Sequence, residues 1–178
     1  MILDIGSRYR PRGNINVDIV KYPGINCLAD AHYLPFKDNT FDIVVANQLI
    51  EHCINPPLMI KEAIRVSKNK VIITTPNMHC LRHLLQYIIR RGFLVNEPEH
   101  LYGWTFYYMN NLMKAMEIKN YRISGISLYR DYSKIFYYLF TKPLSLFFDF
   151  SIKLEIWKFK QNIYNDDGMW LRRWFGNE

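Results

Sequence analysis

The chain has 178 residues, of which 49% are hydrophobic and 22% are charged. This composition is typical of a globular domain and excludes a disordered chain, a collagen-like fibre and a coiled coil. The length predicts a single domain. Lys and Arg outnumber Asp and Glu by 23 to 16, giving a net charge of +7. Such a charge either attracts an anionic partner or simply favours solubility.

The cysteines, Cys27, Cys53 and Cys80, are widely spaced and include no C-x-x-C pair. We therefore predict neither a metal site nor a disulfide framework, and a reducing compartment fits best. No signal peptide is recognisable before the first apolar run. The most apolar stretch, residues 135–152, is interrupted by Lys142 and Pro143 and is too short to span a bilayer. We expect a cytoplasmic protein.

The first half of the chain alternates strands and a helix. Strands are predicted over residues 1–5, 15–20, 26–29, 41–46 and 70–75. The last two are near-continuous Val and Ile runs, typical of strands buried on both faces of a parallel sheet. Between them, apolar residues at helical spacing predict a helix over residues 56–66. The order strand, helix, strand indicates an α/β fold.

The second half is less regular. Helices are predicted over residues 79–91 and from an N-cap at Thr105 to about residue 117. Strands are predicted over residues 121–128 and 154–160. Residues 131–151 have a helical pattern broken at Pro143. This aromatic segment could form a substrate lid, a dimer face or a membrane-surface helix, or it could be a pair of helices packed on the core.

Polar and small residues follow the strands at the edge where open α/β sheets bind ligands. In chain order they are Asp4, Gly6, Ser7, Arg8, Asp18, Asp30, Ala31, Asn47 and Gln48. Asp18 could accept two hydrogen bonds from ribose hydroxyls, and Asp30 one from an adenine amine. Each acid alone is more often a turn former, but together and in this order they favour an adenosine-type ligand.

An ordered set of motifs gives the chain a family resemblance. The set comprises Leu3-Asp4-Ile5-Gly6-Ser7, Asn16-Val17-Asp18, the run from Ala29 to Asp42, Ile50-Glu51-His52, Glu62-Ala63-Ile64-Arg65-Val66 and Thr75-Pro76-Asn77. Over residues 1 to about 120 the chain resembles class I S-adenosylmethionine-dependent methyltransferases of the type 11 branch. The resemblance implies a Rossmann-like sheet, mostly parallel with an antiparallel last strand, and helices on both faces. Residues 1–178 would form one domain, with a cofactor-binding core over 1–120 and C-terminal strands, an aromatic-rich helical insertion and a tail over 121–178.

The resemblance also implies roles for the polar edge, with S-adenosyl-L-methionine as cofactor. Gly6 would let the backbone approach the cofactor, with Asp4 and Ser7 around its amino-acid end. Asp18 would bind the ribose. Asp30 and Ala31 would contact the adenine, and Asn47 and Gln48 would lie near the sulfonium.

The first motif departs from the family pattern. Its second glycine is missing, and Arg8 would either obstruct the cofactor or pair with its carboxylate. Only eight residues, 7–14, separate Gly6 from Ile15, so we expect the first helix to be short or absent. Arg10 and Arg12 lie in the same loop and would either replace the missing helix N-terminus or be solvated charges.

Three histidines are candidates for accepting a proton from the substrate. His100, in a loop that should overhang the edge, is the first choice as a catalytic residue. His52 is the second, although its neighbour Glu51 also suggests a structural contact at a helix start. His79 is the third.

We expect methyl transfer to an O or N acceptor on a small molecule, sugar or lipid-like substrate, and the aromatic segment could also form a homodimer face. The alternative is a catalytically degenerate binding or assembly module on the same fold. Asn55-Pro56-Pro57-Leu58 is similar to a motif of DNA amino-methyltransferases, but it lies about eight residues too late and lacks the aromatic. Nucleic acid is therefore not the predicted substrate. The absence of G-x-G-x-x-G argues against a nicotinamide-dependent oxidoreductase.

Overall fold

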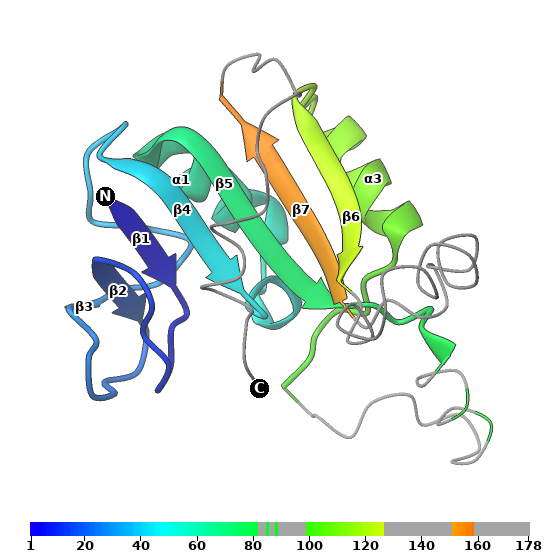
Figure 1. Cartoon of the computed structure of the whole chain (residues 1–178), viewed down its shortest axis with the longest axis horizontal. Coiled ribbons are helices and arrows are strands. Elements are labelled where there is room, and N and C mark those ends of the chain that lie inside the picture. Colours follow the sequence, from blue (N-terminus) through cyan, green and yellow to red (C-terminus); the bar gives the residue numbers. More distant parts are fainter. Residues whose placement is uncertain (82–84, 86–87, 89–98, 127–150, 159–178) are drawn as a thin grey trace, which may run out of the picture.

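The computed structural model describes residues 1–81, 85, 88, 99–126 and 151–158. These residues form one seven-stranded sheet in the order β3-β2-β1-β4-β5-β7-β6 (Figure 1). The strands are β1 (Ile2–Ile5), β2 (Ile15–Asp18), β3 (Cys27–Leu28), β4 (Phe41–Asn47), β5 (Ser67–Pro76), β6 (Tyr121–Ile126) and β7 (Ser151–Trp157). The helices are the 3₁₀ turn η1 (Ile50–His52), α1 (Pro56–Val66) and α3 (Phe106–Ala115).

The sheet is mostly parallel. Strands β1 to β5 pair in parallel, and β7 runs antiparallel to both of its neighbours, β5 and β6. The reversal at β7 confirms the antiparallel last strand expected from the sequence. Because the five parallel strands share one direction, their carboxyl ends meet at one edge, where the polar residues of the sequence gather.

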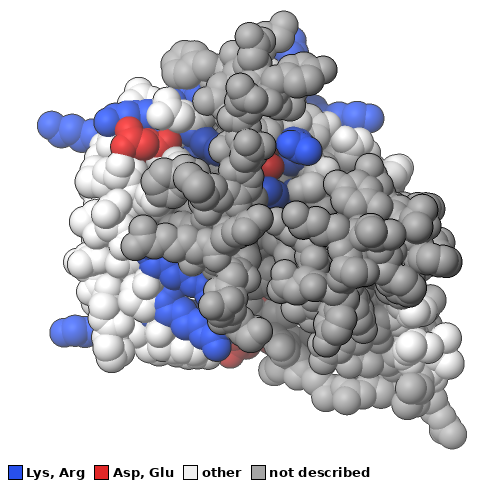
Figure 2. All heavy atoms as spheres, viewed as in Figure 1, with Lys and Arg blue, Asp and Glu red and all other residues white. Residues whose placement is uncertain are grey.

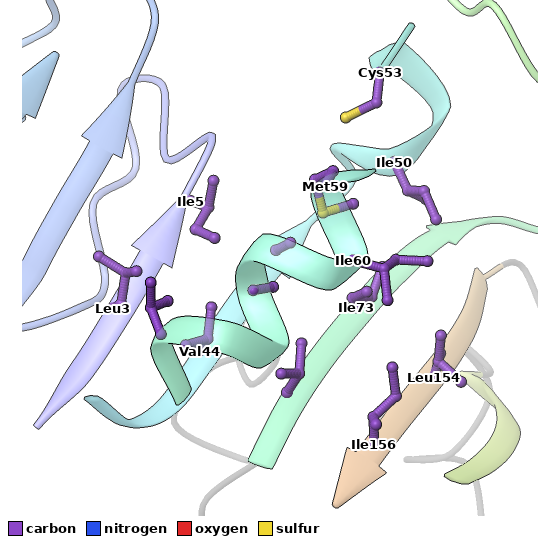
Figure 3. Close-up of a cluster of buried hydrophobic side chains, with 14 of the residues drawn as sticks. Leu3, Ile5, Val44, Ile50, Cys53, Met59, Ile60, Ile73, Leu154 and Ile156 are labelled. Atoms are coloured by element: carbon purple, nitrogen blue, oxygen red, sulfur yellow. The ribbon is translucent and has the colours of Figure 1, made fainter. Parts of the chain in front are cut away.

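One face of the sheet forms the core. Leu3 pairs with Val44, and Val44 pairs with Val71, so these three apolar side chains project from the same face of the sheet. Helix α1 covers them with Met59 and Ile60, which are fully buried (Figure 3). Helix α3 adds its own buried methionines to the same cluster, and in Figure 1 both helices lie behind the sheet.

Both helices begin at caps that the sequence signals. The side chain of Asn55 accepts a hydrogen bond from Leu58 N, ahead of the prolines that start α1. The hydroxyl of Thr105 accepts one from Tyr108 N, which confirms Thr105 as the N-cap of α3. The two helices are thereby fixed at the same end of the sheet as the candidate site.

The opposite face is polar where β5 meets β7. Lys70 and Lys153 both contact Glu155, at 2.7 and 3.1 Å, and Lys153 and Glu155 are buried. Helices cover only the first face among residues 1–81, 99–126 and 151–158. The second helical layer expected from the sequence therefore does not lie within these residues.

The largest differences from the predicted element boundaries are in β5, β2 and β7. β5 starts at Ser67, directly after α1, and β2 ends at Asp18. β7 starts at Ser151 rather than at residue 154, so the helical prediction over residues 131–151 was wrong at Ser151. The pairing of Ile152 with Thr75 places the start of this segment in the sheet. Residues 131–150 and the tail 159–178 lie outside the described residues, as does most of the helix predicted over 79–91.

The expected reduction of the first crossover is confirmed. Residues 7–14 connect β1 to β2 without a helix. Of the helices that the structure describes, none is long and apolar enough to cross a membrane.

Candidate functional site

The loop after β1 begins with a tight turn at Gly6. Its φ is +70°, a conformation that favours glycine, and its N–H donates to Val17 O at 2.8 Å. A Cβ at this position would lie 2.7 Å from Leu49 Cδ1. Gly6 therefore lets Leu49, in the segment after β4, approach the end of β1.

Two buried carboxylates hold the helix-free loop in place. Asp18 accepts hydrogen bonds from Arg8 N and Val20 N, both at 2.9 Å. Asp4 accepts one from Arg12 N at 3.1 Å. Because the loop has no helix, these backbone N–H groups have no helical partner, and the two carboxylates accept their hydrogen bonds instead. A carboxylate oxygen has more than one lone pair, so these contacts do not use the full accepting capacity of either group.

The carboxyl group of Asp4 titrates in an unusual range. Burial raises its pKa from 3.8 to about 6, and the hydrogen bonds from Arg12 and Ser7 limit the rise. The group is only 2% exposed. A cationic ligand group at this position would stabilise its ionised form.

The side chain of Arg8 points to a distant segment. Its guanidinium contacts the Glu99 carboxylate at 3.0 Å, with both side chains about half exposed or more. Glu99 in turn accepts a hydrogen bond at its backbone carbonyl from His52 Nδ1, at 3.1 Å. Glu99 therefore joins the loop after β1 to η1, a role that the sequence did not indicate.

Asp30 and His32 form a separate pair at the end of β3. Asp30 Oδ1 accepts hydrogen bonds from His32 N at 2.9 Å and from His32 Nδ1 at 2.6 Å. Although partial burial acts to raise the pKa of Asp30, these bonds lower it below its usual value. His32 Nε2 accepts from Asn55 N at 3.2 Å. The pair links the edge of the sheet to the start of α1, and Ala31 lies between its members.

The ends of β4 and β5 are tied together. Asn47 Oδ1 accepts a hydrogen bond from Thr74 Oγ1, and Gln48 Nε2 donates to the same hydroxyl at 3.2 Å. Gln48 has a φ of +51° and its N–H donates to Thr74 O at 3.0 Å. Thr74 thus orients both residues predicted to lie near the sulfonium, a role that no motif in the sequence indicates.

The two predicted catalytic histidines meet. The rings of His52 and His100 pack edge to face with centroids 4.7 Å apart. Beside them Glu51 is 1% exposed, and its Oε2 accepts from Thr75 Oγ1 at 3.0 Å. Leu101 N donates to Glu51 O at 2.8 Å, which fastens the loop carrying His100 onto η1.

The surroundings of this histidine pair are aromatic. Tyr102 and Trp104 follow His100, with their rings 5.9 Å apart, and the Tyr102 hydroxyl donates to Ile54 O at 3.1 Å. A different hollow, lined among others by Ser67, Ile118 and Lys158, opens at the opposite edge of the sheet and contains none of the predicted site residues.

Comparison with known proteins agrees with this arrangement. The model of a methyltransferase-domain family matches residues 6–74. No curated protein matches the chain. The matched segment runs from the Gly6 turn to Thr74 and so includes the polar ends of β1 to β4.

Solved structures share the fold at low identity. A SAM-dependent methyltransferase from Thermotoga maritima, described as a possible histamine N-methyltransferase, is 14% identical with a TM-score of 0.61, over 89% of this chain and 82% of its own. A SAM-dependent methyltransferase from Archaeoglobus fulgidus is 16% identical with a TM-score of 0.58, over 88% and 85%. The small RNA methyltransferase HEN1 is 14% identical with a TM-score of 0.58, over 90% of this chain and 23% of its own.

Proposed function

Because the chain has the fold of class I S-adenosylmethionine-dependent methyltransferases, we propose that it transfers a methyl group from that cofactor to an O or N acceptor. The observation that carries the proposal is the Gly6 turn after β1, with Asp18 at the end of β2 and Asp30 two residues after the end of β3, on neighbouring strands of the sheet. This order matches what an adenosine-containing ligand needs from a sheet edge.

The cofactor supplies a methyl group on a positively charged sulfur. We assign its amino-acid end to Asp4, Ser7 and the Arg8 guanidinium. Asp18 binds the ribose. Asp30 and Ala31 receive the adenine, and Asn47 and Gln48, held by Thr74, border the sulfonium.

The protein's part in such a displacement is to align the acceptor with the methyl group, exclude water and manage one proton. We assign acceptor binding and proton removal to His100 and His52. Their rings are in contact, and they lie on segments fastened to each other through Glu51 and Glu99.

A small-molecule, sugar or lipid-like acceptor fits the exposed residues near the histidines. Leu101 and Tyr102, which directly follow His100, are 55% and 42% exposed. The basic side chains visible on the face in Figure 2 lie at several separate places rather than in one patch. The solved relatives are named for both histamine and small RNA, so the fold alone does not choose between these acceptor classes.

The competing function is a binding or assembly module without catalysis. It is favoured by the engagement of Asp18 with Arg8 N and Val20 N, since the ribose-binding acid is already occupied by the protein's own backbone. We propose a cytoplasmic location for either function, because Cys27, Cys53 and Cys80 are in the reduced form. Dimer formation and membrane-surface contact would involve residues 131–178.

The proposal is tested by incubating the full chain with methyl-labelled S-adenosylmethionine and pools of hydroxyl and amine compounds, grouped as small molecules, sugars and lipids. Formation of S-adenosylhomocysteine together with a labelled product is expected for at least one pool. The activity should be lost in Asp18→Asn and kept in Glu117→Gln, an exposed acid at the end of α3. Equal product from wild type and Asp18→Asn in every pool would refute the assignment.

A further inference from the structure

Glu51, His52 and His100 bring three potential metal ligands together at the acceptor side of the site. One ligand atom from each residue lies within 4.8 Å of the other two. We propose that these three residues bind one divalent first-row transition-metal ion. The cysteine spacing gave no hint of such a site, because its ligands are a carboxylate and two imidazoles drawn from separate segments.

The side-chain chemistry suits an ion such as Zn²⁺, Mn²⁺ or Co²⁺. Two histidines and one carboxylate are a ligand set found in catalytic metal sites. Metal–ligand distances of about 2.0–2.2 Å require the ligand atoms to close to about 3.3 Å. The rings of His52 and His100 are only partly buried, so rotation of these side chains can supply the adjustment.

The hydrogen bond of His52 fixes the ring in the state that a metal needs. A backbone carbonyl only accepts, so Nδ1 must carry the proton that binds Glu99 O at 3.1 Å. In the neutral ring Nε2 then keeps its lone pair. A histidine that ligates through one nitrogen typically donates the other N–H to such a carbonyl.

The remaining two ligands are also held by contacts already formed. Thr75 Oγ1 donates to Glu51 Oε2 at 3.0 Å, which orients the carboxylate. The N–H groups of Leu101 and Tyr102 both donate to Glu51 O, at 2.8 and 3.3 Å. These bonds place His100 beside η1 before any ion binds, so binding requires little reorganisation of the backbone.

Three protein ligands leave at least one coordination position open. This part of the inference rests on the proposed function: the open position would take a hydroxyl of the acceptor, which narrows the reaction to O-methylation. Coordination lowers the pKa of a bound oxygen acid. With both imidazoles bound to the ion, the metal would replace the histidines in promoting proton loss. The hydroxyl proton would go to water, and the oxygen would form the new bond to the methyl carbon. The sulfur would keep the electron pair of the broken C–S bond.

The test uses the full chain freed of metal with a chelator and titrated with Zn²⁺ by calorimetry and with Co²⁺ by visible absorption. Wild type is expected to bind one ion per chain with ligand-field bands of a low-coordinate nitrogen and oxygen site. His52→Ala and His100→Ala should each weaken binding by at least about 10-fold. His79→Ala, which removes an exposed histidine outside the cluster, should bind as wild type does.

Two results would overturn the metal site: wild type that binds no ion, or histidine variants that bind as tightly as His79→Ala. Circular dichroism shows whether each variant folds, and the test rests on the two partly exposed histidines because Glu51 is buried.

The open coordination position is tested with catechol, an aromatic compound whose hydroxyl oxygens bind metals. Catechol should shift the Co²⁺ bands, and an unchanged spectrum would overturn the proposal that an acceptor hydroxyl binds the ion. Cofactor binding is measured separately on the metal-free protein. Metal binding without cofactor binding would refute the proposed function alone. Cofactor binding without metal binding would refute the metal site alone.

Discussion

The Arg8 guanidinium and the Glu99 carboxylate lie 3.0 Å apart although 91 positions separate them in the chain. This contact joins the loop after β1 to the segment that precedes α3. Both side chains are substantially exposed, so we expect the pair to contribute less than about 1 kcal/mol to stability. The contact matters because it sets the position of the Arg8 guanidinium, and Arg8 directly follows the Gly6-Ser7 turn.

The first prediction concerns cofactor affinity. Arg8→Ala should weaken S-adenosylmethionine binding by roughly 10-fold, the loss of one charge-assisted contact. Glu99→Gln should leave affinity unchanged or strengthen it, because it releases the guanidinium for the cofactor carboxylate. Calorimetry with both variants decides the matter. If Arg8→Ala binds more tightly than wild type, Arg8 obstructs the cofactor instead.

The second prediction is a pH dependence from Asp4. Because burial raises the pKa of Asp4 from 3.8 to about 6, the folded chain keeps a proton that the unfolded chain has already lost between these values. The free energy of unfolding should therefore fall as the pH rises from about 4 to about 6, by about 3 kcal/mol through this group. Above about pH 7 it should be insensitive to Asp4.

Asp4→Asn separates this effect from other carboxylates. The variant should be more stable than wild type at pH 7, with a flatter pH profile, since its amide oxygen can still accept from Arg12 N. Urea unfolding across the pH range measures both, with Glu117→Gln as the control. A profile that keeps the wild-type slope in Asp4→Asn would contradict the assignment.

The third prediction concerns the turn at Gly6. Gly6→Ala should destabilise the fold by about 2 kcal/mol, because φ is +70° and the new Cβ would meet Leu49 Cδ1. Leu49→Ala in the same chain should remove the steric part and leave the backbone part. A double-mutant cycle by urea unfolding measures the coupling. Strict additivity of the two substitutions would show that Leu49 does not clash with a side chain at position 6.

The fourth prediction tests the support of the loop before β4. Arg65 donates to Glu62, to Asp38 and to the carbonyls of Leu34 and Phe36, all within 2.9 Å. Arg65→Ala should cost about 2 kcal/mol. Arg65→Lys should recover only part of that loss, since an ammonium lacks the planar fork. Chemical denaturation compares them with Lys61→Ala, an exposed position on α1 where little change is expected; equal stability of all three variants would count against this network.

Local signals made much of the fold predictable. The Val and Ile runs of β4 and β5, the Pro56 start of α1 and the Thr105 cap depend on residues close in the chain. The start of β7 was missed because Ile152 is recruited by pairing with Thr75, a contact 77 positions away. Strand pairing of this kind leaves no local pattern.

The site was predictable in its residue types but not in its connections. Asp18 lies at the end of β2 and Asp30 shortly after β3, as expected, and the sequence identifies His52 and His100 only as two separate candidates. Their meeting depends on the carbonyl of Glu99 and the backbone of Glu51, which no side-chain motif can reveal. The contact of Asp4 with Arg12 arises only because the loop folds back where a helix is missing.

Calorimetric titration of the full chain with S-adenosylmethionine tests the central claim most directly. Wild type and Glu117→Gln are expected to bind with dissociation constants below about 1 mM, in the range usual for enzyme substrates. Asp18→Asn, shown to be folded by circular dichroism, should bind at least about 10-fold more weakly. No binding by wild type at millimolar concentration, or equal binding by Asp18→Asn, would contradict the assignment of this edge as a methyltransferase cofactor site.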